Sequence, residues 1–204
     1  MASANPSTRL ALVDQARRLM LERGYSATTL DQVCAAAGVS KGAFFHYFKT
    51  KEALGQAVLA RHGELSQQAY RDAPFLSKTD PLERLLGYVE FTASLVRHPV
   101  RDACLFGMFS QELAASEPQF RLGCASAFAQ WAGGLKAMLE DARQRHAPRA
   151  RISVDEAAEH FIAVFEGALI LAKAKGDPGT VKVHLDLYKR WLKSLFTPDQ
   201  RRKR

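Results

Sequence analysis

Hydrophobic residues recur along this chain at intervals of three and four, the spacing that places side chains on one face of an α-helix. The spacing is clearest between residues 30 and 37, where the apolar positions are Leu30, Val33, Cys34 and Ala37. No stretch shows the strict alternation of a β-strand, and none has the glycine-rich loop that holds phosphate groups. The pattern therefore predicts an all-α protein.

Capping residues, prolines and glycines divide the chain into separate helices. Serine, threonine or aspartate precedes most of the apolar stretches, and glycine or proline follows them, as expected at helix starts and stops. We expect about nine helices, with the approximate ranges 8–23, 30–37, 41–48, 51–73, 81–97, 105–113, 118–147, 154–175 and 180–196.

The second and third of these helices have the junction of a helix-turn-helix. Thr29 and Gln32 have the spacing of a capping box, which predicts the start of the first helix of the pair. Gly38 can adopt the left-handed conformation that ends this helix, and Ser40 can cap the next one. Two short helices joined by a tight turn that contains glycine form a helix-turn-helix.

The helix that begins at residue 41 has a face suited to close approach by another molecule. Phe44 and Phe48 share the inward face, whereas the opposite face is slim at Gly42 and Ala43 and has lysines around it. Such a face suits a helix in the major groove of DNA, although an ordinary amphipathic helix with a charged edge has the same pattern. The expected DNA-binding residues are Thr29, Ser40, Lys41, Gly42, Ala43, Phe45, His46, Tyr47, Lys49 and Lys51.

The stretch GVSKGAFFHYFKTKEAL, residues 38–54, resembles the signature of the tetracycline-repressor (TetR) family of transcriptional regulators. That signature runs roughly G-V-S-x-G-x-[LF]-Y-x-[HY]-F-x-[SN]-K-[ED]-x-L. The sequence departs from it at Phe45, where the family usually has tyrosine, which puts a hydroxyl contact to DNA in question. The matching positions are Gly38, Val39, Ser40, Gly42, Phe44, Tyr47, Phe48, Lys51, Glu52 and Leu54.

The resemblance covers about the first quarter of the chain, and the length and helical pattern of the remainder also suit the family. It implies a helix-turn-helix DNA-binding domain over residues 1–50, followed by an effector-binding and dimerisation domain over residues 51–204. It further implies a ligand-responsive transcriptional regulator, most often a repressor, that binds a palindromic operator as a dimer. A small-molecule effector would release such a repressor from DNA.

Composition places further limits on the protein. With 204 residues and 47% hydrophobic content, the chain can bury a core as one large domain or two small ones. No apolar run is long enough to span a membrane, and the first residues lack the hydrophobic region of a signal peptide, so we expect a cytoplasmic protein. Three cysteines, Cys34, Cys104 and Cys124, lack metal-ligand spacing and argue against a disulfide framework.

The net charge of +8 is concentrated at the two ends of the chain. Residues 1–61 hold eight Lys and Arg against four Asp and Glu, a balance of +4, and residues 62–200 hold seventeen of each and are neutral. The tail at 201–204 supplies the other +4. A basic N-terminal region on a neutral body is typical of a phosphate-binding module. The tail could contact DNA or serve only as a solubilising end.

The last two predicted helices carry an apolar stripe that suits a partner helix. Its positions in the final helix alternate by four and three, and small residues in the preceding helix would allow close contact. A homodimer with a four-helix interface is predicted, and the alternative is that both stripes pack only within their own chain. The expected interface residues are Ala163, Gly167, Val181, Leu185, Tyr188, Leu192 and Leu195.

Aromatic residues and methionines gather in the sequence between the helix-turn-helix and the final helices. Members of the resembling family hold a small-molecule pocket in this part of the chain, and such linings suit an apolar ligand. A packed core is the alternative explanation for most of these residues. The candidate effector-binding residues are Phe91, Cys104, Met108, Phe109, Phe128, Trp131, Phe161, Phe165 and Lys173.

Cys104 is a candidate sensor because of the segment in which it lies. ACLFGMFSQELAASEPQF resembles the same region in the NemR-like branch of the family, whose members answer to reactive electrophiles through a cysteine that opens the sixth helix. A thiol at a helix N-terminus has a lowered pKa, and Lys173 could lower it further if the two lie close together. The alternative is a buried, inert cysteine.

Two other classes of protein compete with a ligand-responsive regulator. An enzyme has little support, because the chain contains no G-x-S-x-G, no H-E-x-x-H and no close set of Cys, His and Asp. We therefore expect no catalytic residues, cofactor or metal site. An architectural DNA-binding protein without an effector is the second alternative, and a ligand-dependent loss of operator affinity would separate it from a sensor.

Overall fold

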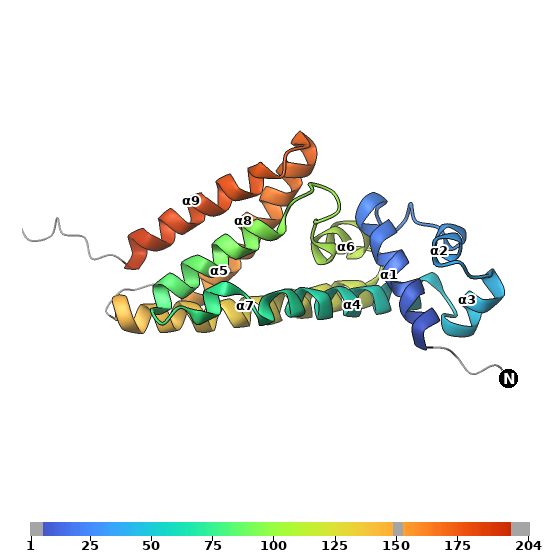
Figure 1. Cartoon of the computed structure of the whole chain (residues 1–204), viewed down its shortest axis with the longest axis horizontal. Coiled ribbons are helices and arrows are strands. Elements are labelled where there is room, and N and C mark those ends of the chain that lie inside the picture. The colour runs from blue at the N-terminus through green and yellow to red at the C-terminus, as the bar shows by residue number, and fades with distance from the viewer. Residues whose placement is uncertain (1–5, 149–152, 197–204) are drawn as a thin grey trace, which may run out of the picture. The chain divides into compact units, whose positions relative to one another are not determined.

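The computed structural model describes residues 6–148 and 153–196, and the regular structure of these residues is helical throughout (Figure 1). Nine α-helices and one short 3-10 helix occur in this part of the chain. They are α1 (Pro6–Arg23), α2 (Leu30–Ala37), α3 (Lys41–Tyr47), α4 (Lys51–Arg71), η1 (Pro74–Ser77), α5 (Pro81–Leu95), α6 (Leu105–Leu113), α7 (Pro118–His146), α8 (Val154–Lys175) and α9 (Gly179–Phe196).

The predicted all-α architecture is confirmed, and most helix starts have the cap expected from the sequence. Asp80 accepts a hydrogen bond from the Glu83 N–H at 2.9 Å at the start of α5, and Ser153 accepts one from Glu156 at the start of α8. Gly176 adopts a φ of 66° just after α8, a conformation that favours glycine. The predicted ranges missed η1, because its four residues carry no helical periodicity. The basic tail lies outside the described residues.

The chain forms two compact units. Unit 1 contains the residues up to 71 together with 103–127, and unit 2 contains 72–102 and the residues from 128 onward. Helix α7 contributes its first part to unit 1 and the rest to unit 2. The domain boundary that we predicted at residue 50 stays a prediction, and unit 1 adds α4, α6 and the beginning of α7 to the first three helices.

Unit 1 is built around α1, which packs against α2, α4 and α6. The largest fully buried side chains of its core are all apolar. They are Leu12, Met20, Phe44, Leu54, Leu105, Phe109 and Phe120. The helices come unusually close at Gly55, where an added Cβ would lie 2.8 Å from Phe120 Cζ and 2.9 Å from Tyr25 Cε2. A glycine is therefore required at this point of α4.

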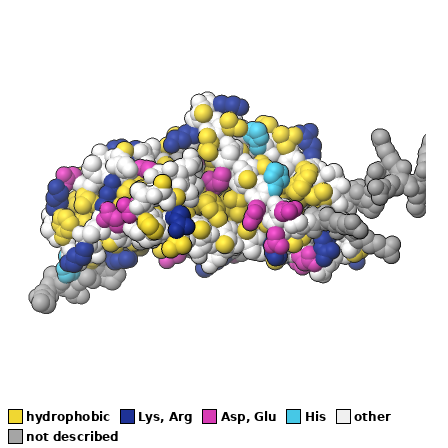
Figure 2. Space-filling model, turned by 180° about the vertical axis from the view of Figure 1, so that it is seen from behind, with side chains coloured by type: hydrophobic (Ala, Val, Ile, Leu, Met, Phe, Trp, Pro, Cys, Tyr) yellow, Lys and Arg dark blue, Asp and Glu magenta, His cyan; other side chains and the backbone are white. Residues whose placement is uncertain are grey.

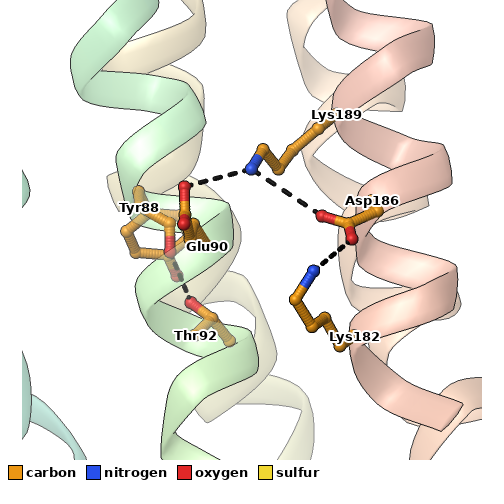
Figure 3. A network of polar contacts seen from close by, with 6 residues as sticks. All are labelled: Tyr88, Glu90, Thr92, Lys182, Asp186 and Lys189. Carbon is orange, nitrogen blue, oxygen red and sulfur yellow. Dashed lines mark hydrogen bonds and ion pairs between the residues drawn. The ribbon is translucent and has the colours of Figure 1, made fainter. Parts of the chain in front are cut away.

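Unit 2 is built from α5, α8, α9 and the part of α7 from residue 128 onward, with η1 against α5. Phe161 lies fully buried at its centre, and the Tyr188 hydroxyl donates a hydrogen bond of 2.7 Å to the Ala157 carbonyl, which joins α9 to α8. A surface network joins α9 to α5 (Figure 3), in which Lys189 Nζ lies 3.1 Å from Glu90 Oε2 and 3.7 Å from Asp186 Oδ1.

The surface in Figure 2 carries hydrophobic side chains among scattered basic and acidic ones. Apolar residues also make up much of any soluble protein's surface, so their presence alone identifies no site. Among the described helices, none combines the length and the apolar character that crossing a bilayer requires.

Candidate nucleic-acid interface

The turn between α2 and α3 has the hydrogen bonds that the sequence predicts. At the start of α2, the Gln32 N–H donates to Thr29 Oγ1 at 3.3 Å, and the Thr29 N–H donates to Gln32 Oε1 at 3.0 Å. Gly38 ends the helix with a φ of 68°. Ser40 Oγ then accepts from the Ala43 N–H at 3.2 Å and starts α3. These bonds fix the two short helices as a helix-turn-helix.

Neighbouring phenylalanines of α3 have opposite environments. Phe44 is completely buried and Phe48 nearly so, with their ring centroids 5.9 Å apart. Phe45, by contrast, is 44% exposed, and its ring rests edge-on against Phe44 at 5.3 Å. His46 is also exposed. Burial of Phe44 and Phe48 therefore orients α3 so that its outer face carries the Phe45 ring and the His46 imidazole.

Gly42 makes that outer face slim without being needed for folding. A Cβ added there would have no heavy atom nearer than Ser40 Oγ, at 3.9 Å, so the protein itself leaves room for a larger side chain. Ala43 beside it is half-buried. The missing side chain gives a second molecule access to the backbone of α3.

The lysines at the edge of this face differ in how they are held. Lys41 Nζ lies 2.8 Å from Asp31 Oδ1, and this hydrogen-bonded carboxylate raises the lysine pKa. Lys49 Nζ donates to the Phe45 carbonyl at 3.1 Å. Lys51 is more enclosed: it donates to the Ser26 carbonyl at 3.3 Å, and burial lowers its pKa. Lys41 and Lys49 are therefore the lysines that the structure leaves exposed.

The remaining predicted DNA-binding residues lie at the same surface. Thr29 is exposed, with its hydroxyl used in the α2 cap, and Tyr47 is half-buried with its ring edge-on to His46 at 5.2 Å. All ten residues lie on α3, the connections before and after it, and the starts of α2 and α4. Their contacts with DNA stay a prediction.

Two polar residues that the sequence analysis missed support this surface from within unit 1. Glu112 of α6 accepts hydrogen bonds from the backbone N–H groups of Tyr25 and Ser26, between α1 and α2. His62 of α4 contacts Arg17 of α1, and its burial, reinforced by the Arg17 charge, lowers its pKa to about 3. No local pattern marks Glu112, because its partners lie more than 80 residues away in the chain.

The candidate effector-binding residues are divided between the two units. Phe109 lies in the core of unit 1, with ring centroids 5.4 Å from those of both Tyr25 and Phe120, and Met108 packs at the edge of this core. The unit 2 candidates Trp131, Phe161 and Phe165 form an aromatic group, in which Trp131 Nε1 donates a hydrogen bond to the Tyr88 hydroxyl. Phe91 and Phe128 are half-buried in unit 2. A packed core thus accounts for Phe109.

Cys104 occupies the position predicted for it. It is the N-cap residue of α6 and is half-buried, whereas Cys34 and Cys124 are buried and have pKa values raised by burial. Lys173 is exposed near the end of α8, in unit 2. The reactivity of Cys104 and the role of Lys173 stay predictions.

The assignment of the apolar stripe in α9 needs correction. Val181, Leu185, Tyr188 and Leu192 are buried within the chain itself, since this face of α9 packs on α5 and α8. Ala163 is exposed, and Gly167 and Leu195 are half-buried. The exposed large hydrophobic side chains of the two helices are instead Ile170, Leu171, Val183, Leu187 and Trp191. A dimer stays a prediction, but its apolar surface would come from these residues.

The described residues contain no group of three or more His, Cys, Asp or Glu that could hold a metal ion. The buried His62 instead serves helix packing, with an N–H donor at each side of its ring.

Comparison with known proteins gives a consistent family assignment. Residues 12–58 match the family "Bacterial regulatory proteins, tetR family", and residues 81–186 match "Tetracyclin repressor-like, C-terminal domain". The HTH-type transcriptional repressor DhaR of Mycobacterium sp. (strain GP1) is 29% identical over 170 residues, 83% of this chain and 84% of DhaR. Transcriptional regulator AcuR of Cereibacter sphaeroides is 30% identical over 164 residues, 78% of this chain and 73% of AcuR.

Structural comparison leads to the same family. The crystal structure of reduced E. coli NemR superimposes with a TM-score of 0.74 at 26% identity, covering 90% of this chain and 96% of NemR. The helix-turn-helix described above lies within the segment that matches the N-terminal family domain. The chain therefore belongs to the TetR family of bacterial transcriptional regulators.

Proposed function

We propose that this protein is a ligand-responsive repressor that binds a palindromic operator as a dimer and leaves it when a small molecule binds. The exposed face of α3 is the observation that carries DNA recognition. The opposite face of the helix is buried through Phe44 and Phe48. The exposed face presents Phe45, His46 and the bare backbone at Gly42. A helix presented in this way fits the major groove, where base edges are read.

Selection from a random pool of duplex DNA tests the first part of the proposal. We expect enrichment of a sequence with two inverted half-sites, because a symmetric dimer presents two equivalent α3 helices. Lys41→Ala should weaken binding to every duplex and lower the salt dependence, since it removes one phosphate-binding charge. Lys175→Ala, in the last turn of α8, is a matched control. Footprinting without a protected site at moderate salt would disprove sequence-specific binding.

The dimer is supported by the exposed apolar residues of α8 and α9. Val183, Leu187 and Trp191 are all at least 36% exposed and recur every four residues along α9, so they share one face. Contiguous apolar surface of this kind marks protein–protein contacts. Val183→Glu combined with Leu187→Glu should give monomers with much weaker operator binding. Leu122→Glu, at a 61% exposed site on α7, serves as the control. Sedimentation of the wild type as a monomer at micromolar concentration would contradict the dimer.

The effector is proposed to be a small, largely apolar molecule that binds among the aromatic side chains of unit 2. Trp131 with the buried Phe161 and Phe165 forms an aromatic group that carries a polar Tyr88–Trp131 hydrogen bond, and such a mixture of aromatic and polar groups is typical of ligand-site linings. Such a molecule releases DNA only if it favours the non-binding conformation. A metabolite screen by thermal shift and operator release tests this. Failure of all compounds, with nothing co-purifying, would favour the effector-free alternative.

Modification of Cys104 is a second way to switch the same repressor. The half-buried N-cap position of this thiol and the similarity to NemR favour it. The thiolate would add to the β-carbon of an unsaturated carbonyl compound, forming a C–S bond while the α-carbon takes a proton from water. N-ethylmaleimide with mass spectrometry should label Cys104 before the buried Cys34 and Cys124. If Cys104→Ser is released from DNA as readily as the wild type, this mode is excluded.

A further inference from the structure

Glu112 makes an unusual contact with the connection between α1 and α2. Its Oε2 accepts a hydrogen bond from the Tyr25 N–H at 2.8 Å, and its Oε1 accepts one from the Ser26 N–H at 2.6 Å. One carboxylate therefore binds two consecutive backbone donors. Hydrogen bonds to a charged acceptor are stronger than those between neutral groups, so this contact holds the connection firmly against α6.

The connection is built to receive this carboxylate. Gly24 has a φ of 90°, and a Cβ added to it would lie 3.1 Å from Glu112 Oε2. On the other side, Lys51 Nζ donates to the Ser26 carbonyl at 3.3 Å, and its charge lies 4.4 Å above the Tyr25 ring. Thr28 Oγ1 closes the turn by donating to the Gly24 carbonyl at 2.7 Å. The segment is thus fixed by α6 on one side and by α4 on the other.

Helix α6 is itself anchored at its beginning. The Leu105 N–H lies 3.3 Å from His62 Nε2, and Arg17 Nε lies 3.2 Å from His62 Nδ1. A neutral imidazole accepts at only one nitrogen, so either tautomer satisfies one of the two donors. The N–H at the beginning of α6 thus faces the buried His62 of α4, and Glu112 near the other end of α6 contacts the α1–α2 connection.

We propose that Glu112 is a positioning residue for DNA recognition, which holds the helix-turn-helix in its binding-competent orientation without touching DNA. The α1–α2 connection sets the direction in which α2 leaves α1, and α2 in turn carries α3 through the tight turn at Gly38. A displacement of α6 would therefore reach α3 through Glu112. This inference rests on the proposed function, since it assumes that α3 reads an operator.

The experiment compares operator binding by Glu112→Ala, Glu112→Gln and the control Gln111→Ala, whose native side chain bonds only within α6. Wild-type binding to the selected operator is measured first. We expect Glu112→Ala to lose roughly ten-fold or more in affinity, because two charge-assisted bonds are lost. The affinity of Glu112→Gln should lie between those of Glu112→Ala and the wild type, since its amide keeps one acceptor oxygen. The salt dependence should match the wild type in both variants, because no phosphate contact changes.

Hydrogen exchange supplies the readout that separates positioning from general stability. Exchange of the Tyr25 and Ser26 amides should accelerate in Glu112→Ala while the core amides of α1 stay protected. Unchanged affinity despite faster exchange would overturn the proposal, as would a change in the preferred operator bases, which would indicate that Glu112 itself contacts DNA. If Glu112→Ala does not fold, the isosteric Glu112→Gln decides alone. Absence of any wild-type operator would instead refute the proposed function, and the positioning role with it.

Discussion

Units 1 and 2 differ in what they leave on the surface. The large exposed hydrophobic residues of unit 1 are scattered as Leu10, Phe45 and Leu122, whereas all those of unit 2 except Leu76 lie on α8 and α9. Unit 1 also contains most of the N-terminal excess of positive charge. A surface with isolated apolar residues and positive charge suits a nucleic acid, and a gathered apolar face suits a protein partner. The two units are thus shaped for different partners.

The two units also use polar groups differently. Unit 1 holds polar contacts that join segments far apart in sequence, through the buried His62 and through the exposed Glu112, whose bond to the Tyr25 N–H is half-buried. Unit 2 joins α5 to α9 by the ion pair of Lys189 with Glu90 (Figure 3), in which the Glu90 side chain is 71% exposed and that of Lys189 19%. Buried polar contacts fix one arrangement strongly, whereas exposed ion pairs contribute little. Unit 1 should therefore respond more sharply to substitution, and four predictions test this difference.

The largest effect is expected from Phe44→Ala in unit 1. Removing a completely buried phenylalanine should cost about 3–5 kcal/mol of unfolding free energy, because a cavity remains. Phe45→Ala should change the unfolding free energy by less than about 0.5 kcal/mol, since its ring is largely outside the core, yet alter the preferred operator bases. Urea unfolding and DNA selection measure the two effects. Equal stability losses would show that the two faces of α3 are not distinct.

His62 should make the free energy of unfolding depend on pH, with a change of about 2 kcal/mol. Its pKa is lowered from 6.5 to about 3 in the folded protein, so the unfolded chain binds more protons between these values. Its contribution to stability is complete above pH 6.5 and falls as the pH decreases, by about 2 kcal/mol at pH 5. Denaturant unfolding of the wild type and His62→Gln at pH 8 and pH 5 tests this. The same pH dependence in both proteins would show that His62 is not the cause.

These contrasts also show which features the sequence could predict. The caps at Thr29, Ser40 and Ser153 and the end of α2 at Gly38 depend on residues within four positions, so local spacing was sufficient. The aromatic Phe44 and Phe48 were likewise assigned correctly to the inner face, because helical periodicity determines which residues lie together.

The sequence could not predict which side of α9 is buried within the chain. This helix has hydrophobic residues on two sides, with Leu185 and Leu192 on one and Leu187 and Trp191 on the other. Periodicity identifies both stripes, but only the packing of α5 and α8 selects the buried one. The contact of Glu112 was inaccessible for a related reason, because a residue in α6 meets the α1–α2 connection only after the chain has folded.

Gly167→Ala in unit 2 should raise the free energy of unfolding by about 1 kcal/mol. Nothing lies within 4 Å of a Cβ added at this position of α8, and alanine is about 1 kcal/mol more favourable than glycine inside a helix. The gain should be complete where the protein is monomeric. We expect it to shrink as concentration rises, because the added methyl group would meet the partner helix. Unfolding measured over a range of protein concentrations tests this, and a constant gain would exclude Gly167 from the interface.

The smallest effect is expected from the ion pair between α5 and α9. Glu90→Gln removes the charge that faces Lys189, but the Glu90 side chain is 71% exposed, so water and salt already weaken the attraction. The loss should be about 0.2–1 kcal/mol and should decrease in 1 M salt. Lys182→Met, which removes an ion pair within α9 alone, is the matched control. A loss above about 2 kcal/mol, unchanged by salt, would mean that unit 2 depends on its polar contacts as unit 1 does. The buried side chains of α9 argue for the smaller value, because they already hold this helix against α5 and α8.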